Sequence, residues 1–334
     1  MTLTNAQWRL AARPSGLPKA ADWQYTEEPA AEAGDGQIRV AVQYLSLDPA
    51  MRSWMNPGRS YVPPVGIGEV MRAGGIAEVI DSRHRGFEVG QTVFGTFGVQ
   101  AYAVSDGTGV SVVDTALAPA PVYLNTLGTG GLTAYFGLLE VGRPEAGQTV
   151  VVSAAAGSVG SITGQLAKIH GCRVVGIAGG AEKCRVLVEE LGFDAAVDYK
   201  AGELRAQLRE QAPDGIDVFF DNVGGEILEA VLSRLARGAR IVLSGAVSQY
   251  NTADAPRGPA NYMQLLVNRA SMTGFVFTDY ANRFPEATKA LAGWLADGSL
   301  VSREHLLDGG IGAFPEALLK LFAGENTGKL ILAL

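Results

Sequence analysis

Residues 149–160 decide the fold, and they read Thr-Val-Val-Val-Ser-Ala-Ala-Ala-Gly-Ser-Val-Gly. The first five residues predict a buried strand, and apolar residues after the turn recur at helical spacing up to Gly171. Between them, Gly157 would let the backbone approach a phosphate and Gly160 would let the helix pack on the strand. Because a helix N-terminus offers N–H donors to an anion, we predict a pyrophosphate-binding turn. A tight strand-to-helix connection without a ligand is the alternative.

The rest of the second half repeats this alternation of apolar strands and amphipathic helices. Further strands are expected at residues 173–178, 195–197, 216–220, 240–243 and 272–277. With the strand at 149–153 they make six, which matches a doubly wound parallel (Rossmann) sheet in an α/β protein.

The first half has a different texture, in which short alternating apolar runs are cut by glycine and proline. These runs lie at residues 38–42, 76–80, 91–94 and 102–104. They predict a β-rich, partly barrel-like domain. We therefore expect residues 1–125 with 305–334 to form a β-rich substrate (catalytic) domain, and residues 126–304 to form the dinucleotide-binding domain.

Composition excludes several classes of protein. The chain has 27 basic and 34 acidic residues, a net charge of −7 with no blocks of like charge, so we expect neither nucleic acid nor an anionic membrane as a partner. The long uncharged stretch 115–139 contains prolines, glycines and an asparagine that a lipid-facing helix would not carry. The N-terminus lacks the apolar core of a signal peptide, and two cysteines form no disulfide framework. We expect a cytoplasmic protein.

Zinc chemistry is not expected either. A catalytic zinc needs three protein ligands of the Cys, His or carboxylate kind, and a structural zinc would need a cluster of four ligands such as cysteines. No cysteine precedes Cys172, and the predicted first domain before residue 125 has His84 as its single histidine. We therefore predict no metal site.

The choice of dinucleotide depends on the end of the second strand. An acidic residue there would hold the ribose hydroxyls of NAD. Residues 178–181 read Ala-Gly-Gly-Ala, and Lys183 follows two positions later. A 2′-phosphate would meet no acid at the strand end and could pair with Lys183, which favours NADP(H). A solvated lysine in the first helical turn is the alternative for Lys183.

Four motifs in order along the chain carry a resemblance to a known family. They are Leu-Ser-Leu-Asp-Pro at 45–49, Gly-Leu-Thr-Ala-Tyr-Phe-Gly-Leu-Leu-Glu at 131–140, the turn at 154–160 and Phe-Asp-Asn-Val-Gly-Gly at 220–225. The chain resembles the zinc-independent medium-chain dehydrogenases/reductases, in the branch of leukotriene/prostaglandin, plant 2-alkenal and bacterial curcumin reductases. The likeness extends to Gly328-Lys329. It implies a GroES-like first domain and NADPH-dependent reduction of the carbon–carbon double bond of α,β-unsaturated aldehydes and ketones.

The resemblance also implies roles for individual residues. It assigns the pyrophosphate to Gly157, Ser158, Val159 and Gly160, and the adenosine phosphate to Lys183 and Tyr199. It assigns the remaining cofactor or nicotinamide pocket to Asn222, Ser244, Gly245, Ala246, Val247, Ser248, Phe275, Val276, Phe277 and Asn326. The chain departs from the family's pattern at Ala50, where relatives usually carry an aromatic residue, and at Thr129-Gly130, where many carry Met-Pro.

Tyr250 is the candidate catalytic residue. Hydride addition to an enone leaves an enolate, which needs a hydrogen-bond donor at its oxygen and a source of a proton. Tyr250 follows the predicted strand at 240–243, at the carboxyl edge of the sheet where ligands of this fold bind. A phenol is neutral at pH 7 and can donate without carrying a charge. The alternative is a loop tyrosine that only packs.

Two other functions stay open, namely an NADPH-dependent quinone reductase and a catalytically silent NADPH-binding sensor. We also expect a homodimer, because relatives pair through their nucleotide-binding domains and the run 272–277 could form the edge strand for such pairing. A strand covered within one chain is the alternative.

Overall fold

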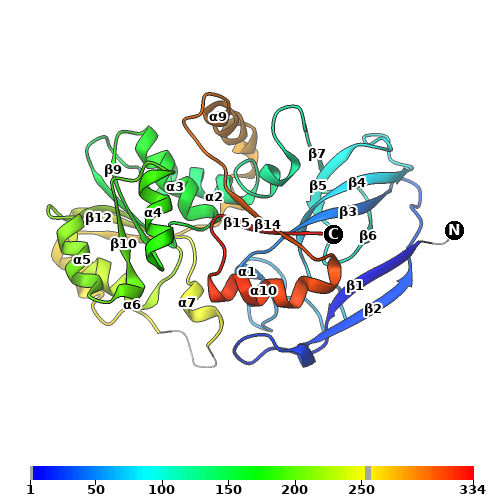
Figure 1. The fold of residues 1–334 in the computed structure, drawn as a ribbon, viewed down its shortest axis with the longest axis horizontal. Helices are drawn as coiled ribbons and strands as arrows, with labels where there is room; N and C mark the ends of the chain where they lie inside the picture. Colours follow the sequence, from blue (N-terminus) through cyan, green and yellow to red (C-terminus); the bar gives the residue numbers. More distant parts are fainter. Residues whose placement is uncertain (1–2, 253–256) are drawn as a thin grey trace. The chain divides into compact units, whose positions relative to one another are not determined.

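The computed structural model describes residues 3–252 and 257–334. The chain divides into two compact units, each drawn in Figure 1. Unit 1 comprises Met1–Leu124 and Glu304–Leu334, and unit 2 comprises Asn125–Arg303.

Unit 2 is built on a six-stranded parallel sheet with the order β10-β9-β8-β11-β12-β13. The chain enters at the centre, winds outward to one edge, returns and winds to the other edge. This is the strand order of a doubly wound dinucleotide fold, so the α/β prediction is confirmed. The strands are β8 (Thr149–Ser153), β9 (Arg173–Ala178), β10 (Ala195–Asp198), β11 (Ile216–Asp221), β12 (Leu235–Leu243) and β13 (Ser271–Gly274).

Helices connect these strands, and the sheet is buried between them. All five residues of β8 are buried, as expected for a central strand of a parallel sheet. The helical elements are α2 (Thr129–Phe136), η3 (Gly137–Gly142), α3 (Ser158–Ile169), α4 (Ala181–Glu189), η4 (Tyr199–Ala201), α5 (Leu204–Gln211), α6 (Gly225–Leu232), α7 (Val247–Tyr250), α8 (Met263–Asn268), η5 (Phe277–Arg283) and α9 (Phe284–Ala296).

Strand boundaries agree at β8 and β9 and differ toward the β13 edge of the sheet. The strand expected at 240–243 begins earlier, at Leu235. The strand expected at 272–277 ends at Gly274 instead. Phe275 packs edge-on against Phe220, with ring centroids 6.3 Å apart, and Phe277 opens the helix η5 and stacks on Phe284. The strand ends before these aromatic residues because their rings pack on different neighbours, Phe220 and Phe284.

Unit 1 is mainly strand. Its seven-stranded sheet contains the path β14-β15-β3-β4-β5-β7, and β6 pairs with β3 outside that path. The strands of this sheet are β3 (Ile38–Ser46), β4 (Gly74–Ser82), β5 (Thr92–Thr96), β6 (Tyr102–Ser105), β7 (Ser111–Val112), β14 (Glu304–Asp308) and β15 (Lys329–Ala333). A separate hairpin pairs β1 (Thr4–Leu10) with β2 (Trp23–Pro29). The helical elements are η1 (Ala20–Asp22), α1 (Ala50–Trp54), η2 (Ala120–Leu124), η6 (Ile311–Ala313) and α10 (Phe314–Ala323).

The last strands of the chain complete this sheet. β15 pairs antiparallel with β3, and β14 pairs parallel with β15. The core of the unit joins Met51 of α1, Phe314 of α10 and Leu330 of β15. Among the described residues, no helix combines the length and apolar character that crossing a membrane requires.

Candidate cofactor site

The turn between β8 and α3 has the geometry of a phosphate cradle. Ala154 adopts a left-handed conformation with φ 47°, and its carbonyl accepts the N–H of Gly157 at 2.9 Å. A Cβ added at Gly160 would lie 2.4 Å from Ala154 O and 2.8 Å from Ala155 Cα, so the helix runs directly over the turn. The first N–H groups of a helix have no acceptor within it, so α3 presents donors and a positive dipole end here. The residues fit a pyrophosphate.

A second group of residues lies where β9 and β10 end. Tyr199 and Lys200 cover Gly179 closely, because a Cβ added at Gly179 would lie 2.8 Å from Tyr199 Cε1 and 2.9 Å from Lys200 Cε. Lys183, in the first turn of α4, is half-buried. Burial, and then the neighbouring charge of Lys200, lowers the pKa of the Lys183 ammonium. Two ammonium groups that repel each other in this way favour an anion between them.

Asp198 is the carboxylate at this corner, and sequence reasoning missed it. It ends β10 and stands in register with Ala178 of β9. Its Oδ1 accepts the N–H groups of Gly180 at 2.8 Å and Lys200 at 2.9 Å. Gln207 of α5 holds Asp198 by its backbone N–H and carbonyl. Lys200 was missed as well; its adjacency to Tyr199 was the signal that could have found it.

The ends of β8 and β11 are joined by a buried polar group. Ser153 Oγ donates to Asp221 Oδ1 at 2.8 Å, and Asn222 Nδ2 donates to Ser153 O at 2.8 Å. Asp221 is 0% exposed and also accepts the N–H groups of Val223 and Gly224. Burial raises the pKa of the Asp221 carboxyl, and these hydrogen bonds offset part of that effect.

The loop after β12 is fastened to the same edge of the sheet. Ser244 N–H donates to Asp221 O at 2.8 Å, and Ser248 Oγ donates to Val223 O at 2.6 Å. Tyr250 ends the one-turn helix α7, and its phenol oxygen accepts the N–H of Ala246 at 3.2 Å. The predicted residues Ser244–Ser248 and Tyr250 therefore share the carboxyl edge with Asn222.

Three of the predicted residues follow β13, and a fourth belongs to the other unit. The rings of Phe275 and Phe277 pack on Phe220 and Phe284, while Val276 lies between them. Asn326 lies in unit 1 before β15, buried, and its Nδ2 donates to Gly328 O at 2.6 Å. Within residues 3–252 and 257–334, no group of three or more His, Cys, Asp or Glu side chains could hold a metal ion.

Comparisons with known proteins agree with this architecture. The family described as the N-terminal domain of oxidoreductase matches residues 6–113, and the family described as zinc-binding dehydrogenase matches residues 158–293. The NADPH-dependent curcumin reductase of Escherichia coli is 40% identical over 98% of this chain and 96% of its own length. The NADP(+)-dependent 2-alkenal reductase of Nicotiana tabacum is 37% identical over 99% and 97%. The crystal structure of Vibrio vulnificus CurA in complex with NADPH has a TM-score of 0.92 and 42% identity, over 98% of both chains.

Fold and relatives together define the class. The architecture is that of the medium-chain dehydrogenases/reductases, a family of oxidoreductases. The chain belongs to the zinc-independent branch of this family, whose members include NADP-dependent curcumin and 2-alkenal reductases and a prostaglandin reductase.

Proposed function

We propose that the protein uses NADPH to reduce the carbon–carbon double bond of α,β-unsaturated aldehydes and ketones. The observation that carries this proposal is similarity along almost the whole chain to reductases of that type, at 40% identity to the E. coli curcumin reductase. The names of its relatives include a 2-alkenal, which is an α,β-unsaturated aldehyde.

Two groups of residues at the carboxyl edge of the unit 2 sheet, the turn after β8 and the residues after β9 and β10, support NADPH as the reductant. The pyrophosphate would lie at Gly157, Ser158, Val159 and Gly160, where a helix begins over a tight turn. Gly157 would let the backbone approach the phosphate, and the N–H groups of the residues after it would donate to the anion. The 2′-phosphate would lie with Lys183, Tyr199 and Lys200, where two ammonium groups lie near each other and the neighbouring Asp198 carboxylate accepts backbone N–H groups.

For the chemical step, we assign the carbonyl oxygen of the substrate to Tyr250. Bound NADPH supplies a hydride to the β-carbon. The π electrons then move to the carbonyl oxygen as an enolate, which the Tyr250 hydroxyl stabilises by donating a hydrogen bond. In its contact with Ala246 the phenol oxygen is the acceptor, and accepting a hydrogen bond makes its O–H a stronger donor. The α-carbon takes its proton from the phenol or from water, and water restores the phenol.

We propose that the nicotinamide side of the cofactor site is lined by Asn222, Ser244–Ser248, Phe275–Phe277 and Asn326.

We further propose a cytoplasmic homodimer. Both cysteines are free thiols, which suits a reducing compartment. β13 pairs with β12 at the edge of the described sheet, and the adjacent helix α8 exposes Leu266 by 69%.

The test is a panel of 2-alkenals, enones and quinones assayed with NADPH, with the products identified by mass spectrometry. We expect saturated aldehydes and ketones, with deuterium from 4-deuterated NADPH on the β-carbon. Reduction of the carbonyl to an alcohol, or turnover of quinones alone, would contradict the proposal. Tight NADPH binding without turnover of any compound would instead indicate a silent NADPH-binding protein.

A further inference from the structure

The hydroxyl of Ser158, the first residue of α3, forms a hydrogen bond outside the phosphate turn. Its Oγ donates to Asn125 Oδ1 at 2.6 Å. Asn125 is 0% exposed, and its Nδ2 donates to Ser302 Oγ at 3.3 Å and to Arg303 O at 3.2 Å. The side chain of Asn125 therefore connects the turn to residues 302–303 through hydrogen bonds.

Residues 301–303 form the last segment of unit 2, which we call the exit segment. The chain enters unit 2 at Asn125 and leaves it at Arg303. Asn125 is the first residue of the unit and is hydrogen-bonded to its last two, Ser302 and Arg303. Thr126 Oγ1 forms a further hydrogen bond of 2.6 Å with Ser302 Oγ. Hydrogen bonds therefore connect the residues where the chain enters unit 2 with the residues where it leaves that unit.

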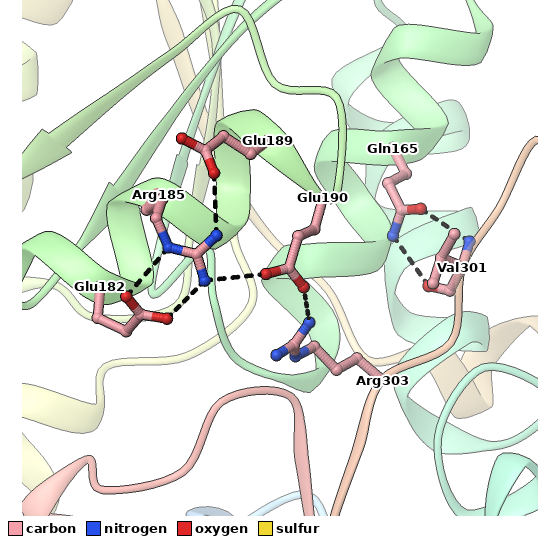
Figure 2. Close-up of polar contacts among 7 residues, drawn as sticks. All are labelled: Gln165, Glu182, Arg185, Glu189, Glu190, Val301 and Arg303. Carbon is pink, nitrogen blue, oxygen red and sulfur yellow. Dashed lines mark hydrogen bonds and ion pairs between the residues drawn. The ribbon is translucent and has the colours of Figure 1, made fainter.

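The exit segment is also held by the two helices that begin at the proposed cofactor contacts. Figure 2 shows Gln165 of α3 bonded twice to the backbone of Val301, at 2.8 and 3.1 Å. The same view shows Arg303 paired with Glu190, which Arg185 of α4 also contacts. The exit segment is therefore held by two separate sets of contacts. One set comes from Gln165 and Glu190, and the other leads through Asn125 to Ser158 in the phosphate turn.

The space at residue 130 makes the Ser158 contact possible. A Cβ added at Gly130 would lie 2.4 Å from Ser158 Oγ and 3.0 Å from Asn125 Oδ1. Glycine at position 130 leaves the room that the Ser158 hydroxyl and the Asn125 amide oxygen need, so the Ser158–Asn125 hydrogen bond depends on this glycine.

We infer that Ser158 is a positioning residue that links occupancy of the phosphate turn to the order of the exit segment through Asn125. The inference rests on the proposed binding of NADPH. A pyrophosphate bound to the N–H groups of the turn restrains the backbone of Ser158, and so restrains the direction of its hydroxyl. Opening of the exit segment must then break a hydrogen bond to a group that is already ordered, which makes opening rarer.

Hydrogen exchange measures this link without any turnover. The peptide covering residues 301–303 is followed with and without saturating NADPH in the parent and in three variants. Ser158→Ala removes the hydroxyl, Ser158→Thr restores one, and Ser161→Ala is the matched control. Ser161 lies one turn further along α3 and bonds within the helix, to Ser158 O.

We expect NADPH to slow exchange of this peptide by about fivefold in the parent, in Ser161→Ala and in Ser158→Thr. In Ser158→Ala the slowing should fall below about twofold when NADPH is raised to a concentration that saturates this variant, as measured by its own binding titration. Gly130→Ala should act like Ser158→Ala, and should add nothing further in the Ser158→Ala background. If Ser158→Thr behaves like the parent, the effect of Ser158→Ala comes from the lost hydroxyl and not from a disturbance of packing at this position.

Equal slowing in Ser158→Ala and Ser161→Ala would overturn the inference and leave the proposed reductase activity standing. So would failure of NADPH to slow exchange in the saturated parent. Normal NADPH-dependent slowing without reduction of any enone would overturn the proposed function and leave the link intact. Absence of NADPH binding in the parent would overturn both.

Discussion

Asp198 Oδ1 accepts the backbone N–H of Gly180 at 2.8 Å, across the parallel pair of β10 and β9. The same oxygen accepts the N–H of Lys200. In NAD-dependent members of this fold an acid at the end of the second strand accepts hydrogen bonds from the ribose hydroxyls. Here that strand, β9, ends at Ala178. The Asp198 carboxylate at the end of β10 is engaged by backbone donors, and the ammonium groups of Lys183 and Lys200 lie nearby. This arrangement favours a ribose that carries a phosphate.

Lys183→Ala should therefore weaken NADPH binding by about 1 to 3 kcal/mol, the free energy of a lost charge-assisted hydrogen bond. NADH affinity should stay nearly the same. Lys168→Ala is a suitable control, because Lys168 is paired with Asp194 at 2.8 Å elsewhere on the unit. Fluorescence titration with both cofactors gives the ratio; equal losses for NADPH and NADH would show that Lys183 does not recognise the phosphate.

NADPH affinity should also depend on pH in a defined direction. Burial and Lys200 lower the pKa of Lys183, so this lysine loses its proton at lower pH than an ordinary lysine. A 2′-phosphate dianion binds the protonated form, so NADPH affinity should fall as pH rises through the lowered pKa, and NADH affinity should not. Lys200→Ala removes one of the two causes and should move the fall to higher pH. A fall at the same pH in both proteins would contradict the coupling of the two lysines.

Gly160→Ala should damage the phosphate turn. Its new Cβ would meet backbone atoms of Ala154 and Ala155, which cannot rotate away as a side chain can. We expect a loss of about 1 to 3 kcal/mol in the free energy of unfolding, typical of overpacking, together with loss of NADPH binding. Gly293→Ala in α9 is the control, since nothing lies within 4 Å of its added Cβ. Denaturation should show that variant gaining about 0.5 to 1 kcal/mol.

Tyr250→Phe should lower turnover of a simple enone by about 10²-fold or more, the scale of a lost oxyanion donor or general acid. NADPH affinity should hardly change. Because we assign the carbonyl oxygen to the hydroxyl of Tyr250, the dependence of turnover on this side chain should be strong. Steady-state kinetics at saturating NADPH decide the matter. Turnover within about twofold of the parent would move the role to a cofactor hydroxyl or a bound water.

The proposed dimer predicts a particle of twice the 35.0 kDa mass of one chain at micromolar concentration. Light scattering measures this directly. Leu266→Asp places a charge on the exposed face of α8, next along the chain to the edge strand β13, and should shift the particle toward the monomer. A parent protein that scatters as a monomer would end the proposal.

The sequence by itself determined the strands β8 and β9, the turn between β8 and α3, and the six-stranded doubly wound sheet. Each strand and the turn are indicated by a local pattern of apolar residues and glycine, and the alternation of strands with helices indicates the sheet. The predicted end of β13 was wrong because Phe275 leaves the strand to pack on Phe220, which is distant in the sequence, and Phe277 stacks on Phe284 at the start of α9.

The tertiary structure alone decided how the polar groups of the cofactor edge are engaged. Asp198 is 18 residues from Gly180 in the chain but neighbours it through the register of β10 on β9, so a search beside Gly180 could not find it. In the same way, the hydroxyl of Ser158 reaches Asn125, 33 residues earlier, because α3 runs beside the start of unit 2. Periodicity predicts which face of an element is buried, whereas hydrogen-bond partners are chosen by strand register and helix packing, which bring distant residues within 3 Å.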